Sequence, residues 1–498
     1  MTERVDPVLK YSFAREHGFA LVSSDDGSAT VAVRDGADSL MLAEVRRVLD
    51  RPLQLEHRSA QDFDGLLSNL YSADGIGAHT EDDLPVESLD SALEGMPKAA
   101  DLLANDDDAP VIRLINGMMA EAVKTKASDV HLEPFENKLS VRLRIDGVLA
   151  EVASLSARLA PYIVSRIKVM ARLDIAEKRI PQDGRLSLTL GDRTFDVRVS
   201  TLPSRHGERV VLRLLDTSQA HLSLEDLGMQ QAVHAGLVDA LSEPNGIILV
   251  TGPTGSGKTT TLYAGLTLLN DQSRNIMTVE DPVEYALEGV SQTQVNAKVG
   301  MTFANGLRAI LRQDPDVVMV GEIRDMETAE MAIQASLTGH LVLSTVHTNS
   351  AVAAITRLRD MGVEPFLLSS TVKAILAQRL VRRLCPSCKN PAANDALIRK
   401  QLGVASKVEA AFFEPVGCAD CGGKGFKGRI GIYELVRIDE TLRRMVQEGA
   451  PEQDIEAHAF RRAKTLSESG QDLVIRGLTT AQEVLRVSRA QGAADAGV

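Results

Sequence analysis

The chain has 498 residues, of which 44% are apolar and 25% are charged, as in proteins with several folded domains. Its 68 acidic residues outnumber 55 basic ones, which disfavours general nucleic-acid binding because that needs a basic surface. No window approaches about 18 uncharged apolar residues, and the charged N-terminus lacks the apolar core of a signal peptide, so we expect a cytoplasmic protein.

Residues 1–71 predict a small mixed α/β domain. Apolar patterns at 19–23, 29–35 and 52–57 indicate strands, and the segment 37–50 indicates an amphipathic helix. No catalytic constellation occurs in this region. We therefore interpret it as a docking module.

The next two segments differ in composition. Residues 72–109 contain eleven Asp or Glu against the single Lys98, which predicts a flexible acidic linker. Residues 110–217 predict an α+β domain, in which a helix with a Pro near its start precedes strands of alternating apolar and polar residues. Arginines are frequent on the polar face of these strands.

From residue 218 onward, helices and strands alternate, which is typical of an α/β domain. A strand at 247–250 leads into 252–259, which has the pattern GxxxxGK[ST], and a helix follows. Backbone N–H groups of such a loop bind phosphates, Lys258 would contact the β- and γ-phosphates, and the Thr259 hydroxyl would bind Mg²⁺. The predicted nucleotide-binding residues of the loop are Gly252, Pro253, Thr254, Gly255, Ser256, Gly257, Lys258, Thr259 and Thr260.

Carboxylates follow two further predicted strands. The strand at 277–279 leads to Glu280, and a carboxylate at the C-terminal end of a strand beside a phosphate loop positions water or metal. The buried strand at 317–320 is followed by Gly321 and Glu322, where most phosphate-loop NTPases have a Mg²⁺-binding Asp.

A third strand, in GHLVLSTVHTN, has His340 and His347 at its two ends. A histidine at the end of a strand next to the phosphate-loop strand is suited to sensing the γ-phosphate. Both histidines are therefore candidate site residues.

The four cysteines, Cys385, Cys388, Cys418 and Cys421, form two CxxC pairs. Four thiolates favour tetrahedral Zn²⁺ in a closed structural site, whereas a redox CxxC or two free pairs are the alternatives. The 29 residues between the pairs predict an excursion within a zinc-binding element at about 380–430.

The phosphate loop, VEDPVEY, DPDVVMVGEIRD and TGHLVLSTVHTN occur in this order. They resemble the Walker A, Asp, Walker B and His boxes of the ATPases of type II/type IV secretion and pilus motors. Residues 127–149 and 179–188 resemble the second N-terminal domain of that family, so the resemblance covers roughly residues 110–490. The tetracysteine insertion and the single N-terminal module are most similar to type II secretion ATPases, the GspE family.

The resemblance implies a RecA-like phosphate-loop ATPase domain at 218–498, α/β in class, with the zinc insertion inside it and C-terminal helices after it. In this family the Walker B strand ends in Gly-Glu. By resemblance, Glu322 helps to bind Mg²⁺ and its water, and Glu280 is the general base. Cations often come from a neighbouring subunit in phosphoryl transfer. The candidates here are Arg198, Arg213, Arg308 and Arg312.

The implied function is that of a ring-forming, hexameric ATPase that uses ATP, Mg²⁺ and Zn²⁺. It would power pseudopilus assembly and protein export at the cytoplasmic face of the inner membrane. Residues 1–71 would bind the cytoplasmic domain of an inner-membrane partner, and an inner-membrane platform protein would be a second partner. Three alternatives stay open: a type IV pilus extension ATPase, a nucleic-acid motor, and a nucleotide-gated scaffold that hardly hydrolyses ATP.

Overall fold

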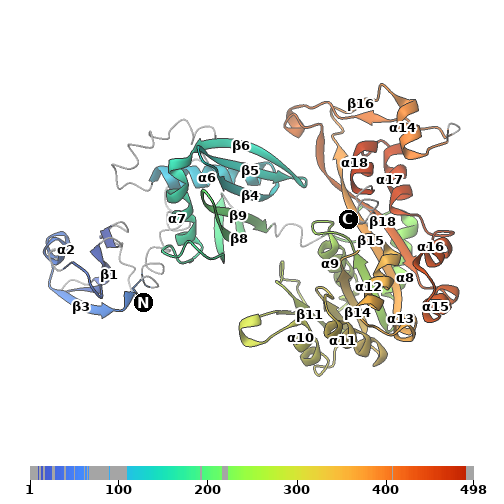
Figure 1. The fold of residues 1–498 in the computed structure, drawn as a ribbon, viewed down its shortest axis with the longest axis horizontal. Coiled ribbons are helices and arrows are strands. Elements are labelled where there is room, and N and C mark those ends of the chain that lie inside the picture. Colours follow the sequence, from blue (N-terminus) through green and yellow to red (C-terminus); the bar gives the residue numbers. More distant parts are fainter. Residues whose placement is uncertain are drawn as a thin grey trace. The chain divides into compact units, whose positions relative to one another are not determined.

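The computed structural model describes residues 109–190, 193–215, 222–405 and 408–488, Leu89 and, with gaps, residues 9–66. Its elements form two compact units, Met1–Asp216 and Thr217–Val498 (Figure 1). The predicted acidic linker lies outside the described residues except for Leu89 and Ala109. Among the helices of the described residues, none combines the length and apolarity that crossing a membrane requires.

The N-terminal part of the first unit has a three-stranded sheet in the order β1-β2-β3, which confirms the predicted strands and helix. Its elements are β1 (Phe19–Ser24), β2 (Ala29–Arg34), α2 (Met41–Leu49) and β3 (Leu53–Arg58). Phe19, Val31 and Val45 pack in its core, because the alternating apolar residues of the strands and one face of the helix meet there.

The rest of this unit is a six-stranded antiparallel sheet in the order β6-β5-β4-β9-β8-β7. Its elements are α6 (Ala109–Lys124), β4 (Ala127–Pro134), β5 (Lys138–Ile145), β6 (Val148–Ser156), α7 (Ala160–Met170), β7 (Gln182–Leu190), β8 (Arg193–Ser204) and β9 (Gly207–Leu215). Apolar residues of α6 and α7 pack with those of the strands in one core. The predicted α+β character is therefore present.

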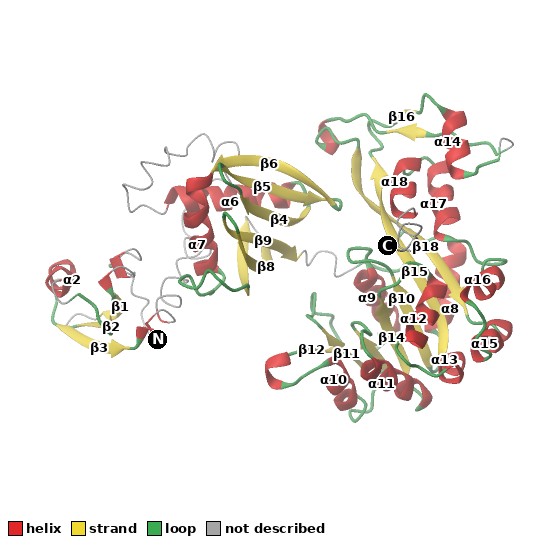
Figure 2. Ribbon diagram, in the orientation of Figure 1, coloured by secondary structure: helices red, strands yellow, loops and turns green. Residues whose placement is uncertain are grey.

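The second unit contains a seven-stranded sheet in the order β12-β11-β13-β14-β10-β15-β18 (Figure 2). Neighbouring strands are parallel except for β18, which runs antiparallel to β15 at one edge. The strands are β10 (Gly246–Thr251), β11 (Ile276–Glu280), β12 (Ser291–Gln294), β13 (Val317–Val320), β14 (Leu341–Val346), β15 (Val372–Leu384) and β18 (Phe426–Arg437).

Helices follow most of these strands along the chain. They are α8 (Gln231–Leu241), α9 (Lys258–Leu269), α10 (Phe303–Ile310), α11 (Met326–Leu337), α12 (Ala351–Asp360), α13 (Pro365–Thr371), α15 (Glu440–Gln447), α16 (Glu452–Ala459), α17 (Leu466–Ile475) and α18 (Ala481–Ser488). Between β15 and β18 lies the excursion with β16 (Asn390–Pro391), α14 (Asp395–Leu402) and β17 (Phe413–Glu414).

Helices cover both faces of the sheet, and this explains the continuous apolar runs of its strands. Along β10, Ile247 and Leu249 join one core, and Ile248 and Val250 join the core on the opposite face. Because the central strands are parallel, their C-terminal ends meet at one edge of the sheet, where a ligand site is expected. The chain segments that follow these ends therefore form the candidate site.

Candidate functional site

The phosphate loop connects β10 to α9. Gly255 and Gly257 have φ values of 78° and 87°, in the left-handed region that glycine adopts without strain. Gly257 is the N-cap of α9, and the crest of the loop from Pro253 to Gly255 is exposed. A helix N-terminus behind an exposed glycine-rich loop provides backbone N–H groups for an anion.

The side chains of Lys258 and Ser256 have no hydrogen-bond partner outside the loop among the described residues. The Lys258 Nζ atom donates to the carbonyls of Gly252 and Pro253 at 2.9 and 3.2 Å. The Ser256 Oγ atom is buried without a hydrogen-bond partner. Burial lowers the pKa of Lys258 to about 8, with Glu322 opposing and Arg379 reinforcing this effect. A bound phosphate would supply the missing negative charge, so these residues fit a phosphate ligand.

Glu322 and His347 lie together at the C-terminal edge of the sheet, near Lys258. The Glu322 carboxylate contacts Arg324 Nη2 at 2.5 Å and His347 Nε2 at 3.3 Å. Burial and the Lys258 charge lower the pKa of His347, although the Glu322 carboxylate opposes this effect. The structure thus brings the predicted residues Lys258, Glu322 and His347 together. It adds Arg324, which was not predicted although it lies in the segment that resembles the Walker B box.

Glu280 lies at the end of β11, where it is 3% exposed. Its Oε1 atom accepts hydrogen bonds from Thr278 Oγ1 at 2.6 Å and Gln292 Nε2 at 3.1 Å, and Tyr263 donates to its Oε2 atom. Among the described residues, these contacts form a cluster separate from the Glu322–His347 pair. Its members Tyr263 and Gln292 were not predicted, because α9 and β12 bring them from other parts of the sequence.

His340 lies at the opposite edge of the sheet from the phosphate loop. It precedes β14, and Gly246 at the start of β10 is opposite Leu341 in parallel register. Its Nδ1 atom contacts the Ala335 carbonyl at 2.8 Å. A strand of this length spans about 20 Å, so the structure does not support the expected contact of His340 with the nucleotide in its own subunit.

Arg308 and Arg312 are exposed on α10 and just after it. Arg308 contacts Asn305 Oδ1 at 2.8 Å and Glu327 at 3.2 Å, and Arg312 Nη1 donates to the Arg308 carbonyl at 3.0 Å. These partners belong to α10 and α11, not to the phosphate loop. The two arginines stay candidates for contacts with another subunit.

Strand register places arginines in one row across the six-stranded sheet. Arg185 is opposite Arg198, Arg198 is opposite Arg213, and Asp129 lies between Arg213 and Arg144. The Asp129 carboxylate contacts Arg213 Nε at 2.8 Å and Arg144 Nε at 3.5 Å. Directly opposed residues share one face of a sheet, so these arginines form an arginine row on one face. Arg144 and Arg185 were not predicted, because register is not local in sequence.

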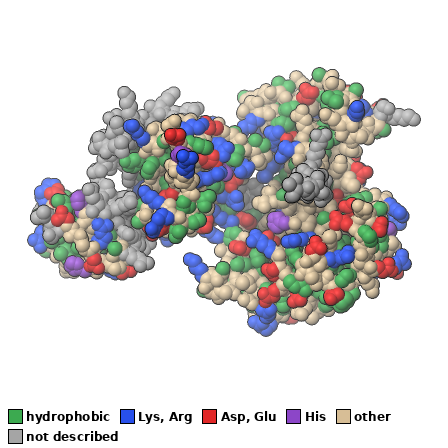
Figure 3. Space-filling view, in the orientation of Figure 1, with side chains coloured by type: hydrophobic (Ala, Val, Ile, Leu, Met, Phe, Trp, Pro, Cys, Tyr) green, Lys and Arg blue, Asp and Glu red, His purple; other side chains and the backbone are tan. Residues whose placement is uncertain are grey.

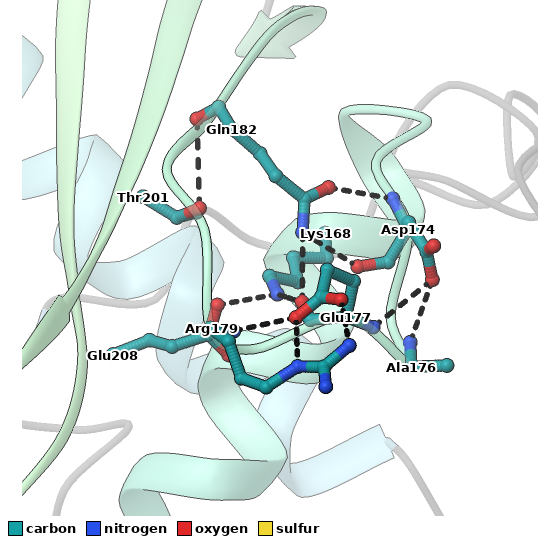
Figure 4. A network of polar contacts seen from close by, with 8 residues as sticks. All are labelled: Lys168, Asp174, Ala176, Glu177, Arg179, Gln182, Thr201 and Glu208. Atoms are coloured by element: carbon teal, nitrogen blue, oxygen red, sulfur yellow. Dashed lines mark hydrogen bonds and ion pairs between the residues drawn. The ribbon is translucent and has the colours of Figure 1, made fainter.

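A polar network holds the segment between α7 and β7, which includes part of the motif at 179–188 (Figure 4). The buried Lys168 donates to the Glu177 carbonyl at 2.7 Å and forms an ion pair with Glu208. The Gln182 amide donates to the same carbonyl at 2.8 Å, and Arg179 contacts the Glu177 carboxylate at 2.6 Å. The network has a structural role that we infer from its buried ion pair.

The four cysteines form one cluster, and all four are free of disulfides. The Sγ atoms of Cys385 and Cys418, Cys388 and Cys421, and Cys418 and Cys421 are each 3.8 Å apart. Four sulfurs at about 2.3 Å from a tetrahedral zinc ion would be about 3.8 Å from one another. The Gly417 N–H donates to Cys388 Sγ at 3.3 Å, as expected for a thiolate. The cluster therefore fits a metal ion such as zinc.

The comparisons with known proteins agree with this architecture. Residues 104–486 match the family model "Type II/IV secretion system protein", and residues 8–71 match a model of an N-terminal domain of "GSPII protein E". The Type II secretion system protein E of Aeromonas hydrophila is 53% identical over 97% of both chains. The Type II secretion system ATPase E of Vibrio cholerae is 51% identical over 97% of this chain and 96% of that protein.

Solved structures share the fold. The pilus retraction motor PilT with bound ADP is 26% identical, with a TM-score of 0.52 over 74% of this chain and 96% of that chain. The Legionella pneumophila ATPase DotB has a TM-score of 0.57 at 19% identity, over 76% of this chain and 95% of that chain, which indicates the fold alone. Since the relatives align over nearly their whole lengths and the family model spans most of the sequence, the chain belongs to the Type II/IV secretion system protein family, in its type II branch.

Proposed function

We propose that this chain hydrolyses ATP and that the hydrolysis powers type II protein secretion. The observation that carries the proposal is the meeting of Lys258, Glu322 and His347 beside a phosphate loop whose crest is exposed. The 51% identity to a type II secretion system ATPase supports the same reaction. The match of residues 8–71 to a GSPII protein E domain favours type II secretion over the pilus extension alternative.

In this mechanism the phosphate loop binds the triphosphate, and Lys258 leaves its loop carbonyls to contact the β- and γ-phosphates. Thr259 and Glu322 are the residues that would hold Mg²⁺, which neutralises charge that develops on the phosphates. His347 would report the presence of the γ-phosphate through its contact with Glu322. Glu280 would accept the proton of the attacking water after its carboxylate leaves the buried cluster.

Hydrolysis in a ring would gain from cations of a neighbouring subunit. The arginine row supports this proposal because it gathers guanidinium groups on one face of the sheet, and such groups are well suited to bind a phosphate chain. Arg198 and Arg213 are the predicted members, to which we add Arg144 and Arg185. A hexamer is the proposed assembly.

The cysteine cluster would hold a structural zinc ion. All four ligands of a tetrahedral ion come from the chain, so no position is left for a substrate. Zinc would fix the two ends of the excursion that contains β16, α14 and β17. This role differs from that of a redox CxxC, which needs an accessible reactive thiol.

Residues 1–71 would bind the cytoplasmic domain of an inner-membrane partner. The conformational change driven by ATP hydrolysis would act on an inner-membrane platform protein. Val48 and Leu55 are exposed apolar side chains of this domain, at 37% and 39%, and are candidate contacts. A photo-crosslinking residue at position 55 of the full chain should capture a single-span secretion protein. Capture of a pilus-cluster protein instead would favour the pilus extension alternative.

The nucleic-acid alternative has less support. In Figure 3, basic and acidic side chains are interspersed over the visible face. The net charge of −13 also disfavours a nucleic-acid footprint. Stimulation of hydrolysis by single-stranded DNA would revive this alternative.

Phosphate release by the purified full chain with Mg²⁺ and ATP tests the enzymatic proposal. Lys258→Ala should lose nucleotide binding and hydrolysis, whereas Glu322→Gln should bind ATP but lose hydrolysis. Glu330→Gln, on an exposed position of α11, is the matched control and should keep wild-type rates. Full secretion by a Glu322→Gln strain would instead support the nucleotide-gated scaffold.

A further inference from the structure

Strand β15 lies directly against the phosphate loop. It runs parallel to β10, with Ala377 opposite Thr251, the last residue of β10. The next residue along β15, Gln378, is therefore level with Gly252, the first residue of the loop. The Gln378 side chain is buried, at 1% exposure, although it is polar.

The Gln378 amide connects the phosphate loop to helix α9. Its Nε2 atom donates to the Ser256 carbonyl at 2.7 Å, and its Oε1 atom accepts from Thr261 Oγ1 at 2.8 Å. Ser256 lies within the loop, and Thr261 lies in the first turns of α9. The Gln378 side chain thus hydrogen-bonds to one residue before the start of α9 and to one residue after it.

The glycines at both ends of the loop permit this approach. A Cβ atom on Gly252 would lie 2.6 Å from the backbone carbonyl oxygen of Gln378, closer than real Cβ atoms come to any neighbour. A Cβ atom on Gly257 would lie 3.1 Å from Gln378 Nε2. Residue 378 therefore contacts the first and the last glycine of the GxxxxG pattern.

The contact with Ser256 has a consequence for phosphate binding. In a trans peptide the carbonyl and the following N–H point in opposite directions. Because Gln378 holds the Ser256 carbonyl toward β15, the N–H of Gly257 points away from β15. That N–H belongs to the N-terminus of α9, which is the anion-binding end of the helix.

An ordinary role in the core would also explain a buried, hydrogen-bonded glutamine. Such a role would not require both side-chain partners to lie in the phosphate loop and its helix, nor the closeness of the side-chain amide to Gly257. Preorganised donors bind a ligand more tightly because they need no rearrangement on binding. Gln378 is placed so that it can hold the backbone N–H groups at the start of α9 in a fixed orientation.

We propose that Gln378 is a positioning residue for the nucleotide, which fixes the Ser256–Gly257 peptide so that its N–H is available to a phosphate. The proposal rests on the proposed binding of ATP by this loop. Gln378 itself does not touch the phosphates, so it acts through the loop.

The test is the affinity of the full chain for a fluorescent ADP analogue, together with kcat and KM for ATP. Gln378→Leu should weaken ADP binding and raise KM about tenfold, because two hydrogen bonds that order the loop are lost, with a smaller change in kcat. Gln471→Leu is the matched control, since that amide donates to the Leu402 carbonyl in another part of the unit. It should keep wild-type affinity.

A second pair of variants covers the case in which Gln378→Leu does not fold. Thr261→Val removes the hydroxyl that holds the Gln378 amide and should weaken ADP binding, whereas Thr261→Ser keeps the hydroxyl and should restore it. Wild-type affinity in folded Gln378→Leu, or in Thr261→Val when the first variant does not fold, would overturn the proposal. Absence of ADP binding by the wild-type chain would instead overturn the proposed function, and this proposal with it.

Discussion

Tyr263 donates a hydrogen bond to Glu280 inside the protein, and this contact joins the phosphate-loop helix α9 to the end of β11. Burial and the Glu280 charge raise the pKa of Tyr263, so its hydroxyl keeps its proton. The Gln292 amide donates to both residues, at 3.2 Å to Tyr263 and 3.1 Å to Glu280. The carboxylate proposed as the general base is therefore oriented by the helix that begins at the phosphate loop.

Glu280→Gln should abolish the proposed base while it keeps the size of the side chain. We expect kcat to fall by about a hundredfold or more, because general-base catalysis typically contributes that much. ADP affinity should stay within about twofold of the wild-type value, since the hydrogen bonds of Glu280 go to Thr278, Gln292 and Tyr263 and not to the loop. A variant with unchanged kcat would remove Glu280 from the mechanism.

Tyr263→Phe removes a single donor from Glu280. We expect kcat to fall by several-fold at an unchanged KM, because the carboxylate loses an orienting hydrogen bond worth about 1 kcal/mol. Tyr433→Phe is the matched control, since its buried hydroxyl donates to the Leu227 carbonyl at 3.0 Å, away from Glu280. Equal rates for the two variants would contradict this role of Tyr263.

Arg213 should act on a nucleotide bound by another subunit. Arg213→Gln should lower kcat about tenfold or more, whereas Arg205→Ala, at an exposed turn, should not. Mixtures of the Arg213→Gln and Lys258→Ala chains should be more active than either chain alone, because an intact loop can then meet an intact arginine. Phosphate release across mixing ratios measures this, and no recovery would place Arg213 outside the shared site.

Stability near the C-terminus should depend on pH through Glu483. Burial alone would raise its pKa, but Arg382 at 2.7 Å and Arg486 at 2.9 Å outweigh burial and lower the pKa to about 2. Because the pKa is lowered on folding, the stabilisation is complete above about pH 4.5 and is lost as the pH falls toward 2. It amounts to about 2 kcal/mol.

Glu483→Gln should therefore increase hydrogen exchange in α18 and β15 at pH 7. At pH 3, after correction for intrinsic exchange rates, the difference from the wild type should be clearly smaller than at pH 7, because part of the stabilisation is then lost. The exposed Glu448→Gln is the control and should match the wild type at both values. A difference that stays constant with pH would assign the effect to packing instead of charge.

Removal of the metal should unfold the cysteine cluster locally. The purified chain should contain about one zinc ion, and Cys388→Ser should lose most of it. Structural zinc contributes on the order of 10 kcal/mol to local folding, so proteolysis between Cys385 and Cys421 should become much faster. Elemental analysis and limited proteolysis check this, and a zinc-free wild type with the same protease resistance would contradict it.

The sequence was sufficient for elements whose signals are local. The phosphate loop, the alternating strands of the second N-terminal domain and the paired cysteines are patterns within short segments. Each is recognisable without knowledge of the fold, because glycine conformation, side-chain alternation and ligand spacing act between near neighbours in the chain. The buried strand β13 before Glu322 is predicted for the same reason.

The structure places His340, a predicted site residue, away from the phosphate loop of its own subunit. It lies next to the same strand as His347 and has the same chemistry, but the parallel direction of β10 and β14 sends the two histidines to opposite edges of the sheet. Only strand direction and order separate them.

The sequence by itself determined where a phosphate loop and a possible metal cluster lie, because these features reside in contiguous motifs. The tertiary structure decided which distant side chains support them. Gln378 meets Ser256, and Tyr263 meets Glu280, through sheet order and helix placement. Strand register aligns the arginine row in the same way. Register and order arise from packing over the whole domain, and for this physical reason no single segment encodes them.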